Sequence, residues 1–343
     1  MAATTSTTDQ AGTGDPVEAI ARDALRLGVG GRLPTTTHYQ AVLGVGSGTV
    51  QKALRRLRSE GALALTARGH QGTFVTAADT ALLWAAARMP PVHLLLPPSA
   101  PPEPLRVAVA VARAFARIGA LTTVGTLRGA EPRLRALGEG GADITLMSAG
   151  AAADLLPAPE SGDPAAAAPG DGRPGHRALA LGKGSYYAPG SLVVVGRRDG
   201  ARPCAGDGTL RVGIDPRSDD HRRLTHAQFP PGTVRYVETD FTHVPRAVLL
   251  GGIDTGVWHT VDSLIPLDAA GLAVAPLSAP GALALADAVS PAVLVAAADN
   301  IPGVLLERAV AQGALDPLPG TAAAAGLPLV EEPLRVRLDR PAG

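Results

Sequence analysis

The sequence has 343 residues, a formal net charge of +0, 46% hydrophobic residues and only 3% aromatic residues. This length is enough for roughly two domains, the neutral charge excludes nucleic-acid binding through an overall basic character, and the single cysteine, Cys204, excludes an internal disulfide framework and a cysteine-based zinc site. No run reaches the ~18 apolar residues of a membrane span and no signal peptide is present, so we expect a cytoplasmic protein.

The first elements in the chain are predicted to be helical. Residues 1–14 are rich in Ala, Thr and Gly and are expected to be a disordered leader. Asp15 and Pro16 then open a helix, because Asp caps the first free amides and Pro fits the first helical position. The sequence that follows predicts two more helices and a hairpin in a winged arrangement. The helices are expected over 33–43 and 47–60 with a glycine turn at 44–46, and the strands over 63–66 and 72–75.

The third of these helices separates apolar from basic residues. Val50, Ala53, Leu54 and Leu57 recur at helical spacing and are expected to face inward. Between residues 32 and 75 six cations accompany one acid, Glu60, so the segment carries a local charge of +5. Helix, tight turn, helix and hairpin form the winged helix-turn-helix layout of DNA-binding domains. The alternative is that the arginines only solvate a helix face.

The same sixty residues resemble the DNA-binding domains of the GntR family. The ordered fragments that carry the resemblance are Leu33-Pro34, Leu43-Gly44-Val45, Thr49-Val50, Lys52-Ala53-Leu54, Leu57, Glu60-Gly61 and Gly72-Thr73-Phe74-Val75. The family pattern has charged or larger polar residues at three places where this chain has Thr35–Thr37, Gly46-Ser47 and Gln51. These departures leave the fold expectation intact and predict weaker phosphate contacts.

Geometry assigns the expected DNA contacts to three groups. The amino end of the third helix is expected to enter the major groove, hydroxyls before the second helix to contact the backbone, and the wing tip to reach the adjacent minor groove or phosphates. The predicted contact residues are Ser47, Gly48, Thr49, Gln51, Lys52 and Arg55 on the helix, Thr35, Thr36 and Thr37 before it, and Arg68, His70 and Gln71 in the wing.

Beyond residue 92 short apolar runs alternate with longer amphipathic ones. This pattern is typical of βα units and predicts a mostly parallel sheet. Strands are expected at 92–96, 121–126, 143–147, 191–195, 210–214, 234–237, 253–258 and 293–297, and helices at 105–118, 133–137, 217–229, 245–250 and 302–312. The Pro/Gly-rich stretch 157–174 is expected to be a flexible insertion.

Two similar passages suggest a domain of two related halves. In 137–144 and again in 250–255, a helix end is followed by glycine, an aspartate and a buried strand. Further fragments resemble the YhfZ-type branch of GntR-like regulators: Arg68–Phe74, Arg128–Glu131, Gly182–Tyr186, Arg211–Asp215 and Ile253–Trp258. The resemblance implies a two-lobed domain similar to type II periplasmic-binding proteins. An aminotransferase-type effector domain is disfavoured, because the only downstream lysine is Lys183.

In a two-lobed fold small ligands bind between the lobes, beyond the carboxyl ends of strands and at helix starts. Arg128 is the expected clamp for a carboxylate or phosphate, because its guanidinium binds in a bidentate manner. The ligand-binding candidates at these positions are Ser99, Arg128, Ser148, Ser185, Tyr186, Asp215, Ser218 and Trp258. They predict a small anionic metabolite, although ordinary loop packing is the alternative for each residue taken alone.

These interpretations combine into one expected organisation, a DNA-binding transcription regulator with a sensor domain. The expected parts are a winged helix-turn-helix at 15–76, a linker at 77–91 and an effector-binding domain at 92–335. Double-stranded operator DNA and a second copy of the chain are the expected partners. No catalytic residue, metal or cofactor is expected, and His221 and His226 are read as part of a solvated helix. Two alternatives stay open: an enzyme with a vestigial DNA-binding domain, and a DNA-binding protein whose C-terminal domain only dimerises.

Overall fold

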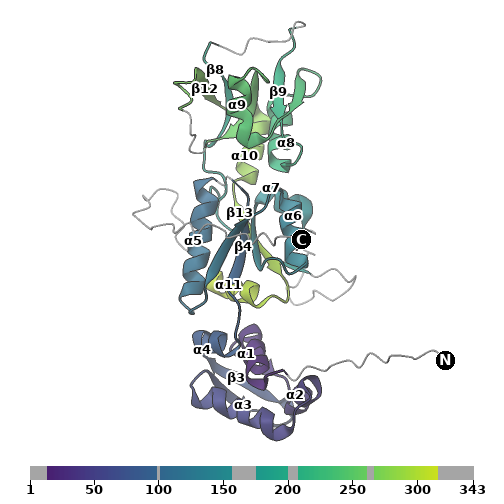
Figure 1. The fold of residues 1–343 in the computed structure, drawn as a ribbon, viewed down its shortest axis with the longest axis vertical. Coiled ribbons are helices and arrows are strands. Elements are labelled where there is room, and N and C mark those ends of the chain that lie inside the picture. Colours follow the sequence, from purple (N-terminus) through teal and green to yellow (C-terminus); the bar gives the residue numbers. More distant parts are fainter. Residues whose placement is uncertain (1–13, 99–100, 157–174, 200–207, 261–265, 316–343) are drawn as a thin grey trace, which may run out of the picture.

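The computed structural model describes residues 14–98, 101–156, 175–199, 208–260 and 266–315. These residues form three bodies stacked along the long axis of the molecule (Figure 1). We call them the N-terminal domain, lobe 1 and lobe 2. The combination of a helix-turn-helix region with a two-lobed α/β domain confirms the predicted fold class. The expected leader before residue 14, the insertion 157–174, the candidate Ser99 and the expected domain end beyond 315 lie outside the described residues.

The N-terminal domain joins three helices to a small antiparallel sheet of order β1-β3-β2. Asp15 caps the first helix, accepting the Val17 amide at 2.9 Å. Residue 33, expected in a helix, belongs instead to the first strand, because Thr35 caps the second helix and so delays its start to Thr36. The elements are α1 Pro16–Leu27, β1 Arg32–Leu33, α2 Thr36–Leu43, α3 Ser47–Ser59, β2 Leu63–Ala67, η1 Gly69–Gln71 and β3 Thr73–Ala78.

The chain then forms a short helix, α4 (Thr80–Ala86), within the segment expected to link the domains. Asp79 caps this helix by accepting the Leu82 amide at 2.9 Å. Leu83 is fully buried, and α4 packs against α1. The helix therefore belongs to the packed core of the N-terminal domain.

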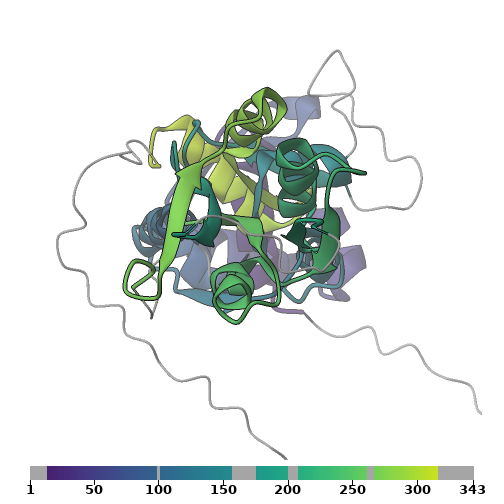
Figure 2. The same ribbon diagram turned by 90° about the horizontal axis from the view of Figure 1, so that it is seen from above.

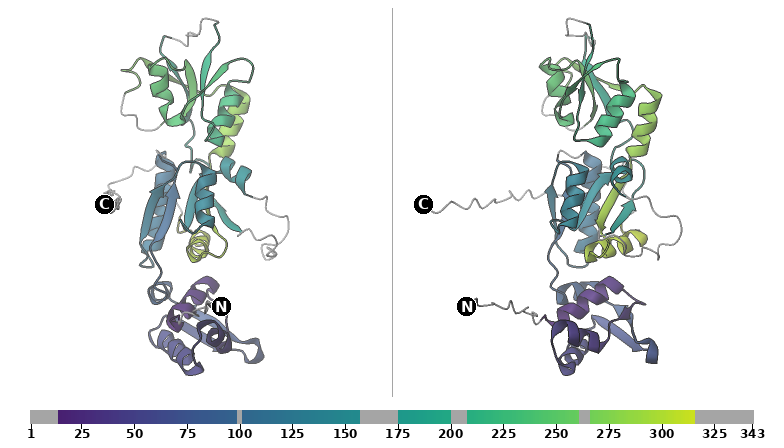
Figure 3. Two further views of the ribbon diagram at one scale, coloured as in Figure 1. Left: turned by 45° about the vertical axis from the view of Figure 1, so that its right-hand side comes forward. Right: turned by 90° about the vertical axis from the view of Figure 1, so that its right-hand side faces the viewer.

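Lobe 1 and lobe 2 each contain a five-stranded sheet with helices on both sides (Figure 3). The elements of lobe 1 are β4 Val92–Leu96, α5 Pro102–Ala116, β5 Thr122–Thr126, α6 Ala130–Gly138, β6 Ile144–Ser148, α7 Ala149–Leu155, β7 His176–Ala180, β13 Ala292–Ala297 and α11 Ile301–Ala311. The elements of lobe 2 are β8 Leu192–Arg197, β9 Arg211–Ile214, α8 Asp219–Gln228, β10 Arg235–Glu238, η2 Phe241–His243, α9 Val244–Leu249, β11 Thr255–His259 and β12 Leu272–Pro276. Helix α10, Pro280–Val289, runs back from lobe 2 to lobe 1.

The expectation of a mostly parallel sheet holds for both lobes, because four of the five strands in each sheet run in one direction and one strand, β13 or β8, runs against them. The sheet orders are β5-β4-β6-β13-β7 and β10-β9-β11-β8-β12. In each sheet the three strands linked by helices are parallel, whereas the other two strands pair antiparallel. The chain crosses between the lobes twice, after β7 and after α10, so β8 and β13 enter their sheets from the lobe junction and run against the βα units.

The two passages noticed in the sequence occupy equivalent places in the two lobes. Asp143 precedes β6 and accepts the backbone amide of His93, the second residue of β4, at 2.8 Å. Asp254 precedes β11 and accepts the amide of Arg211, the first residue of β9, at 2.8 Å. In both cases an aspartate satisfies a free amide at the start of the neighbouring strand, β4 or β9. The internal similarity is therefore structural.

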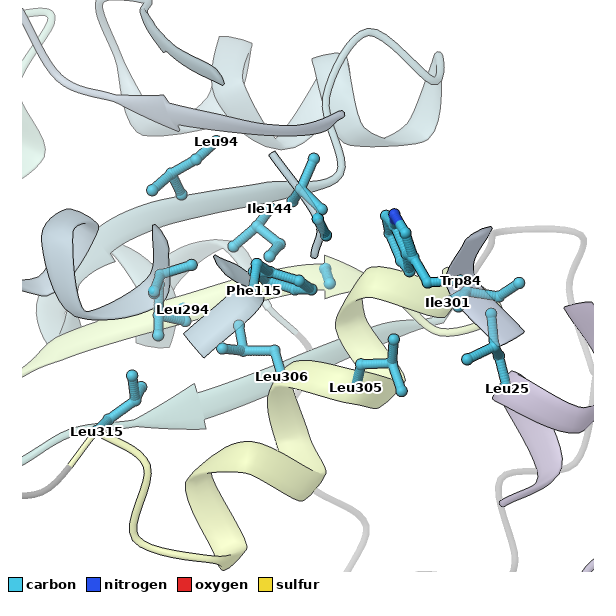
Figure 4. Packing of buried hydrophobic residues seen from close by; sticks show 14 of the residues in the cluster. Leu25, Trp84, Leu94, Phe115, Ile144, Leu294, Ile301, Leu305, Leu306 and Leu315 are labelled. Carbon is cyan, nitrogen blue, oxygen red and sulfur yellow. The ribbon is translucent and has the colours of Figure 1, made fainter. Parts of the chain in front are cut away.

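A hydrophobic core extends from lobe 1 into the N-terminal domain without a break. Leu94, Ile144 and Leu294 fill lobe 1, and Ile301 and Leu305 continue toward Leu25 of α1 (Figure 4). The view along the long axis shows the N-terminal domain directly behind the lobes (Figure 2).

A polar contact reinforces this junction between the domains. The Arg308 guanidinium on α11 donates to the carbonyls of Leu25 and Arg26 at 2.7 and 2.6 Å. Both carbonyls lie at the carboxyl end of α1, where a cation stabilises the helix. Gly28 has φ +70°, and a Cβ there would lie 2.8 Å from the Arg308 guanidinium, so glycine is required for two reasons.

Candidate functional sites

The first candidate site is the exposed surface of α3. Val50, Ala53 and Leu57 are buried against the domain, as expected, and turn the opposite face to solvent. Five predicted contact residues lie on that outer face and are exposed: Ser47, Gly48, Thr49, Gln51 and Lys52. Gly46 is the N-cap residue of α3, and because it has no side chain, the first turn of the helix has no side-chain cap. The amino end of α3 therefore presents free amides and small polar groups together.

Helix α2 is fixed so that its start lies beside this surface. Tyr39 is buried and its hydroxyl donates to Asp23 of α1 at 2.8 Å. Burial raises the pKa of this phenol, which therefore stays protonated as the donor. Thr36 accepts a hydrogen bond from the Gln51 amide group at 3.4 Å. The Thr35 hydroxyl accepts the His38 amide at 3.1 Å, so this side chain caps α2, and Thr37 is exposed.

The hairpin of β2 and β3 forms the wing. Arg68, His70 and Gln71 are all exposed at its tip, where the Arg68 amide donates to Gly72 at 2.8 Å. The Arg68 guanidinium lies 4.6 Å from the centre of the Phe74 ring, a cation–π contact that holds the side chain on the hairpin.

The cations of this surface differ in how they are neutralised. Arg56 pairs with Glu60 at 2.8 Å. Within the described part of the chain no carboxylate lies within ion-pair distance of Lys52, Arg55, Arg58 or Arg68. Unpaired cations on one face, around an exposed helix start, are the electrostatic footprint of a protein that contacts nucleic-acid phosphates.

The second candidate site is a cavity of about 70 Å³ between the lobes. Three helices begin at its wall: α6 and α7 from lobe 1, and α8 from lobe 2. Helix starts carry partial positive charge and free amides, which favour anions. The lining residues include four predicted candidates, Arg128, Ser148, Tyr186 and Ser218, together with Arg133, Tyr187, Arg217 and Asp220.

Arg128 is neutralised within the protein. Its guanidinium extends from the loop before α6 in lobe 1 and forms ion pairs with Asp215 and Asp240 of lobe 2. The side chain of Asp215 is 1% exposed, and its carboxylate also accepts the amides of Arg217 and Phe241 at 3.0 and 3.2 Å. Arg128 and Asp215, both ligand candidates by sequence, therefore join the two lobes.

Arg133 is the buried arginine of the cavity. It is 3% exposed, and one terminal nitrogen donates to the Leu127 carbonyl at 2.9 Å. Its Nε has no hydrogen-bond partner, and no carboxylate of the described residues lies within ion-pair distance. Burial lowers the pKa of this guanidinium, whereas nearby Tyr186 and Tyr187 favour its charged form. The residue keeps a buried positive charge at the cavity wall.

Asp220 brings the opposite charge from lobe 2. It is 6% exposed, and its Oδ2 accepts from the Tyr187 hydroxyl at 3.4 Å. Its Oδ1 has no partner and lies against the first turn of α7, where a Cβ on Gly150 would approach it to 2.5 Å. Burial raises the pKa of this carboxyl to about 6, opposed by hydrogen bonds from Ser148 and Tyr187.

Three other predicted residues have structural positions. The Ser185 hydroxyl donates to Gly182 at 2.6 Å and accepts the Ala292 amide at 2.8 Å, which ties the first crossover to β13. Trp258 is buried in the core of lobe 2 and is not among the cavity-lining residues. His221, expected on a solvated helix, is buried: its Nδ1 accepts the Asp215 amide at 3.0 Å and its Nε2 lies 2.6 Å from the Val257 carbonyl.

Arg133, Tyr187 and Asp220 were missed from the sequence. A signal for Asp220 was present, because Asp220, His221, Leu224 and Thr225 share one buried face of α8 at helical spacing. The adjacent Asp219 hid it, since two neighbouring aspartates look equally solvated in the sequence. Arg133 lies four residues before the buried Leu137 on one face of α6, whereas Arg135 is exposed, and helical spacing alone does not predict a buried charge.

No metal-ligating cluster of three or more His, Cys, Asp or Glu residues occurs in the part of the chain that the structure describes. None of the helices in the same residues combines the length and hydropathy required to cross a bilayer.

Comparison with known proteins identifies two matching family models. The model of the YhfZ C-terminal domain matches residues 79–313, and that of a helix-turn-helix domain matches residues 28–75. None of the curated proteins is similar enough to count as a match.

Several solved structures are similar to this chain at low identity. YhfZ from Shigella flexneri is 22% identical, with a TM-score of 0.43 over 68% of this chain and 89% of that one. The periplasmic VFT2 domain of Bordetella pertussis BvgS is 15% identical, with a TM-score of 0.43 over 69% and 93%. An OxyR C206 mutant from Corynebacterium glutamicum is 15% identical, with a TM-score of 0.37 over 90% and 97%.

Proposed function

Because the chain belongs to the family defined by the YhfZ C-terminal domain and carries a helix-turn-helix domain before it, we propose that it is a transcription regulator of the GntR type. In this proposal a cytoplasmic homodimer binds operator DNA through α3 and the wing. The two-lobed domain senses a small metabolite that binds through an anionic group. The proposal includes no catalytic step.

The exposed start of α3 supports the DNA-binding part of the proposal most directly. A helix of this kind reads base edges in the major groove with its first residues, while surrounding cations contact phosphates. Ser47, Thr49 and Gln51 offer hydrogen-bonding groups for bases, and Lys52 and Arg55 are unpaired cations beside them. The second helix and the wing flank this surface, so all the predicted DNA-contact residues lie on the same small domain.

Replacing Lys52 tests this interface. A preferred duplex is first selected from a randomised double-stranded library with the full-length chain, and affinity is measured by fluorescence anisotropy as a function of salt. We expect Lys52→Ala to weaken binding by roughly tenfold and to reduce the salt slope by about one counterion, because it removes one phosphate contact. Arg56→Ala is the matched control, since Arg56 is already paired with Glu60. Equal losses for the two variants would contradict the assignment.

The same selection tests the proposed dimer. A two-fold dimer places two α3 helices in major grooves about one helical turn apart, and its operator reflects that symmetry. The enriched sequences are therefore expected to contain inverted half-sites with a fixed spacing. A single asymmetric site bound by one chain would reject the dimer.

The sensing part of the proposal rests chiefly on Arg133. A nearly fully buried guanidinium without an ion-pair partner, at the starts of α6 and α7, provides a binding site for an anionic group. The cavity lining includes arginine, serine and aspartate side chains beside apolar ones, whereas a domain that only dimerises would fill this space with apolar side chains. Native mass spectrometry of the gently purified full-length protein is expected to show a bound small molecule, and a bare mass under several purification conditions would contradict sensing.

A further inference from the structure

Two of the five charged residues that line the cavity between the lobes, Arg128 and Asp219, are already neutralised by ion pairs within the protein. Arg128 pairs with Asp215 and Asp240, and Asp240 also accepts the Thr242 amide and hydroxyl at 3.0 and 2.6 Å. Asp219 pairs with Arg222 at 2.8 Å. A ligand gains little from these groups, because it would have to replace an existing ion pair to reach any of them. Arg217 also lines the cavity, but it is exposed, and water solvates its charge.

Two buried charged groups are left without an ion pair among the described residues, Arg133 and Asp220. They lie on opposite lobes and line the same cavity. Each retains a buried polar atom without a hydrogen-bond partner, Nε of Arg133 and Oδ1 of Asp220. Their mutual attraction is too distant to count as an ion pair, so the cavity holds one unmatched positive and one unmatched negative group.

The balance of these charges restricts the chemistry of the ligand. A simple anion would satisfy Arg133 but would place a second negative charge near Asp220. A simple cation would satisfy Asp220 and be repelled by Arg133. Burial makes either repulsion strong, since little water surrounds the Arg133 and Asp220 side chains. A molecule that carries both charges, one toward each lobe, removes both conflicts and also holds the lobes together.

The size of the cavity restricts the ligand further. Its volume of about 70 Å³ is well below that of sites for drug-sized ligands, and it admits on the order of five water molecules. The rings of Tyr186 and Tyr187, whose centres are 4.7 Å apart, close one side. A site of this volume fits a molecule of only a few non-hydrogen atoms.

From this juxtaposition we infer that the sensed metabolite is a small zwitterion of the amino-acid type, with its carboxylate on Arg133 and its ammonium group on Asp220. The inference rests on the proposed sensing function and specifies its ligand class. It also assigns different roles to the two cleft arginines: Arg133 binds the ligand, and Arg128 closes the lobes.

Thermal unfolding of the full-length protein with matched probes tests the ligand class. The probes are glycine, L-alanine and L-serine as zwitterions, acetate as the carboxylate alone and methylammonium as the amine alone, at equal concentration and ionic strength. Selective binding to the folded state raises the melting temperature. We expect at least one zwitterion to raise it, with several-fold smaller shifts for acetate and methylammonium. Equal stabilisation by acetate, or no shift with any zwitterion, would overturn the inference.

Charge-neutral variants separate ligand recognition from a structural role. Asp220→Asn keeps the side-chain size, and we expect it to weaken binding of the stabilising zwitterion at least tenfold while acetate binding is kept or strengthened. Arg133→Gln is expected to lose both. Asp287→Asn is the matched control, because Asp287 is paired with Lys183 and does not line the cavity. Loss of both ligands in Asp220→Asn, with the circular dichroism spectrum unchanged, would reject the ammonium contact.

Failure of this inference is distinguishable from failure of the proposed function. Stabilisation by acetate, phosphate or malonate but not by zwitterions would reject the zwitterion and leave sensing through Arg133 in place. The absence of any stabilising probe, together with a bare mass in native mass spectrometry, would reject sensing itself. A co-purifying amino acid whose loss follows Asp220→Asn would support both.

Discussion

At the scale of single residues, Arg128 shows how the protein closes its own cleft. Its guanidinium forms ion pairs with two carboxylates of lobe 2. A bound dicarboxylate would offer the same two groups to Arg128. The Asp215 carboxylate is held by backbone amides as well, so the lobe 2 side of this contact is rigid. The lobes are therefore held together by ion pairs within the protein itself. An anion that bound Arg128 would have to break them.

Asp220 gives the protein a pH-dependent stability. Because burial raises its folded-state pKa to about 6, above the unfolded value of about 3.9, the folded state binds the proton more tightly. Its contribution to stability is therefore present below pH ~4 and is lost as pH rises toward 6. We expect Asp220→Asn to stabilise the protein relative to wild type by about 2–3 kcal/mol at pH 7, and by far less at pH 4.

Urea unfolding of both proteins at a series of pH values measures this difference. The buried or charged groups around the carboxyl are Arg133, Tyr187, Asp219 and Arg223, and Asp219→Asn controls for the general loss of a charge. A stability difference between Asp220→Asn and wild type that does not vary between pH 4 and 7 would show that Asp220 titrates as it does in the unfolded chain.

The sequence allowed the cleft to be located but not its residues to be ranked. Helix starts and strand ends pointed to Arg128, Ser148, Tyr186 and Ser218, and these four line the cavity. The position of Trp258 in the core of lobe 2 depends on which face of β11 packs against α9, which an all-buried strand does not reveal. Whether Arg128 or Arg133 is paired depends on carboxylates more than 80 residues away in the chain.

At the scale of elements, the turn between α2 and α3 depends on one backbone conformation. Gly44 ends α2 with φ +66° and ψ +28°, in the left-handed region that side chains disfavour. A Cβ at this position would meet no other atom within 4 Å, so conformation is the only cost of a side chain. We expect Gly44→Ala to destabilise the N-terminal domain by about 1 kcal/mol, and Gly44→Asn by less.

Hydrogen exchange of the α2 and α3 amides in the full-length chain measures this local effect. Gly48→Ala provides the matched control, because Gly48 lies within α3, has no positive φ and also has free space around it. Alanine favours a helix over glycine, so the control is expected to slow exchange while Gly44→Ala accelerates it. Slower exchange in both variants would show that the turn tolerates a side chain.

Each element that the sequence did not predict was missed for a physical reason. Helix α7 follows β6 directly, with Ser148 as both the last residue of the strand and the cap of the helix, so no loop residue marks the change. Strand β12 contains Pro276 and is largely exposed, as an edge strand permits. The parallel βα units were predicted well because local periodicity determines them. The direction of the antiparallel strands depends on the crossovers between the lobes, and local periodicity does not encode those crossovers.

At the scale of the whole molecule, the three bodies form a linear stack (Figure 3). The N-terminal domain contacts lobe 1 through α1 and α11, and lobe 2 lies at the far end. Lobe 1 therefore lies between the N-terminal domain and lobe 2. The Arg308 contact, the apolar packing of Leu25 and Leu305, and the Trp84–Phe115 ring contact join the N-terminal domain to lobe 1 within one chain.

Removal of Arg308 is expected to loosen the junction between the domains. Arg308→Ala deprives the Leu25 and Arg26 carbonyls of their donor and opens the packing beside Gly28. We expect limited proteolysis in the 87–91 segment, between α4 and β4, to accelerate several-fold, with each domain keeping its own resistance. Arg113→Ala, on the exposed side of α5, is the control. Unchanged cleavage in Arg308→Ala would show that apolar packing alone holds the domains.

The hydrogen bonds between Arg308 and the end of α1 have a consequence for the order of binding events. Thermodynamic reciprocity requires that any factor by which an occupied cleft changes DNA affinity also applies to the cleft when DNA binds first. Operator DNA would then change the affinity of the cleft for the metabolite. Chains bound to an operator and chains free in solution would therefore be half-saturated at different concentrations of the same metabolite. The number of protein chains and the number of operators would thereby help to set the metabolite concentration at which the protein responds, along with the chemistry of the cleft.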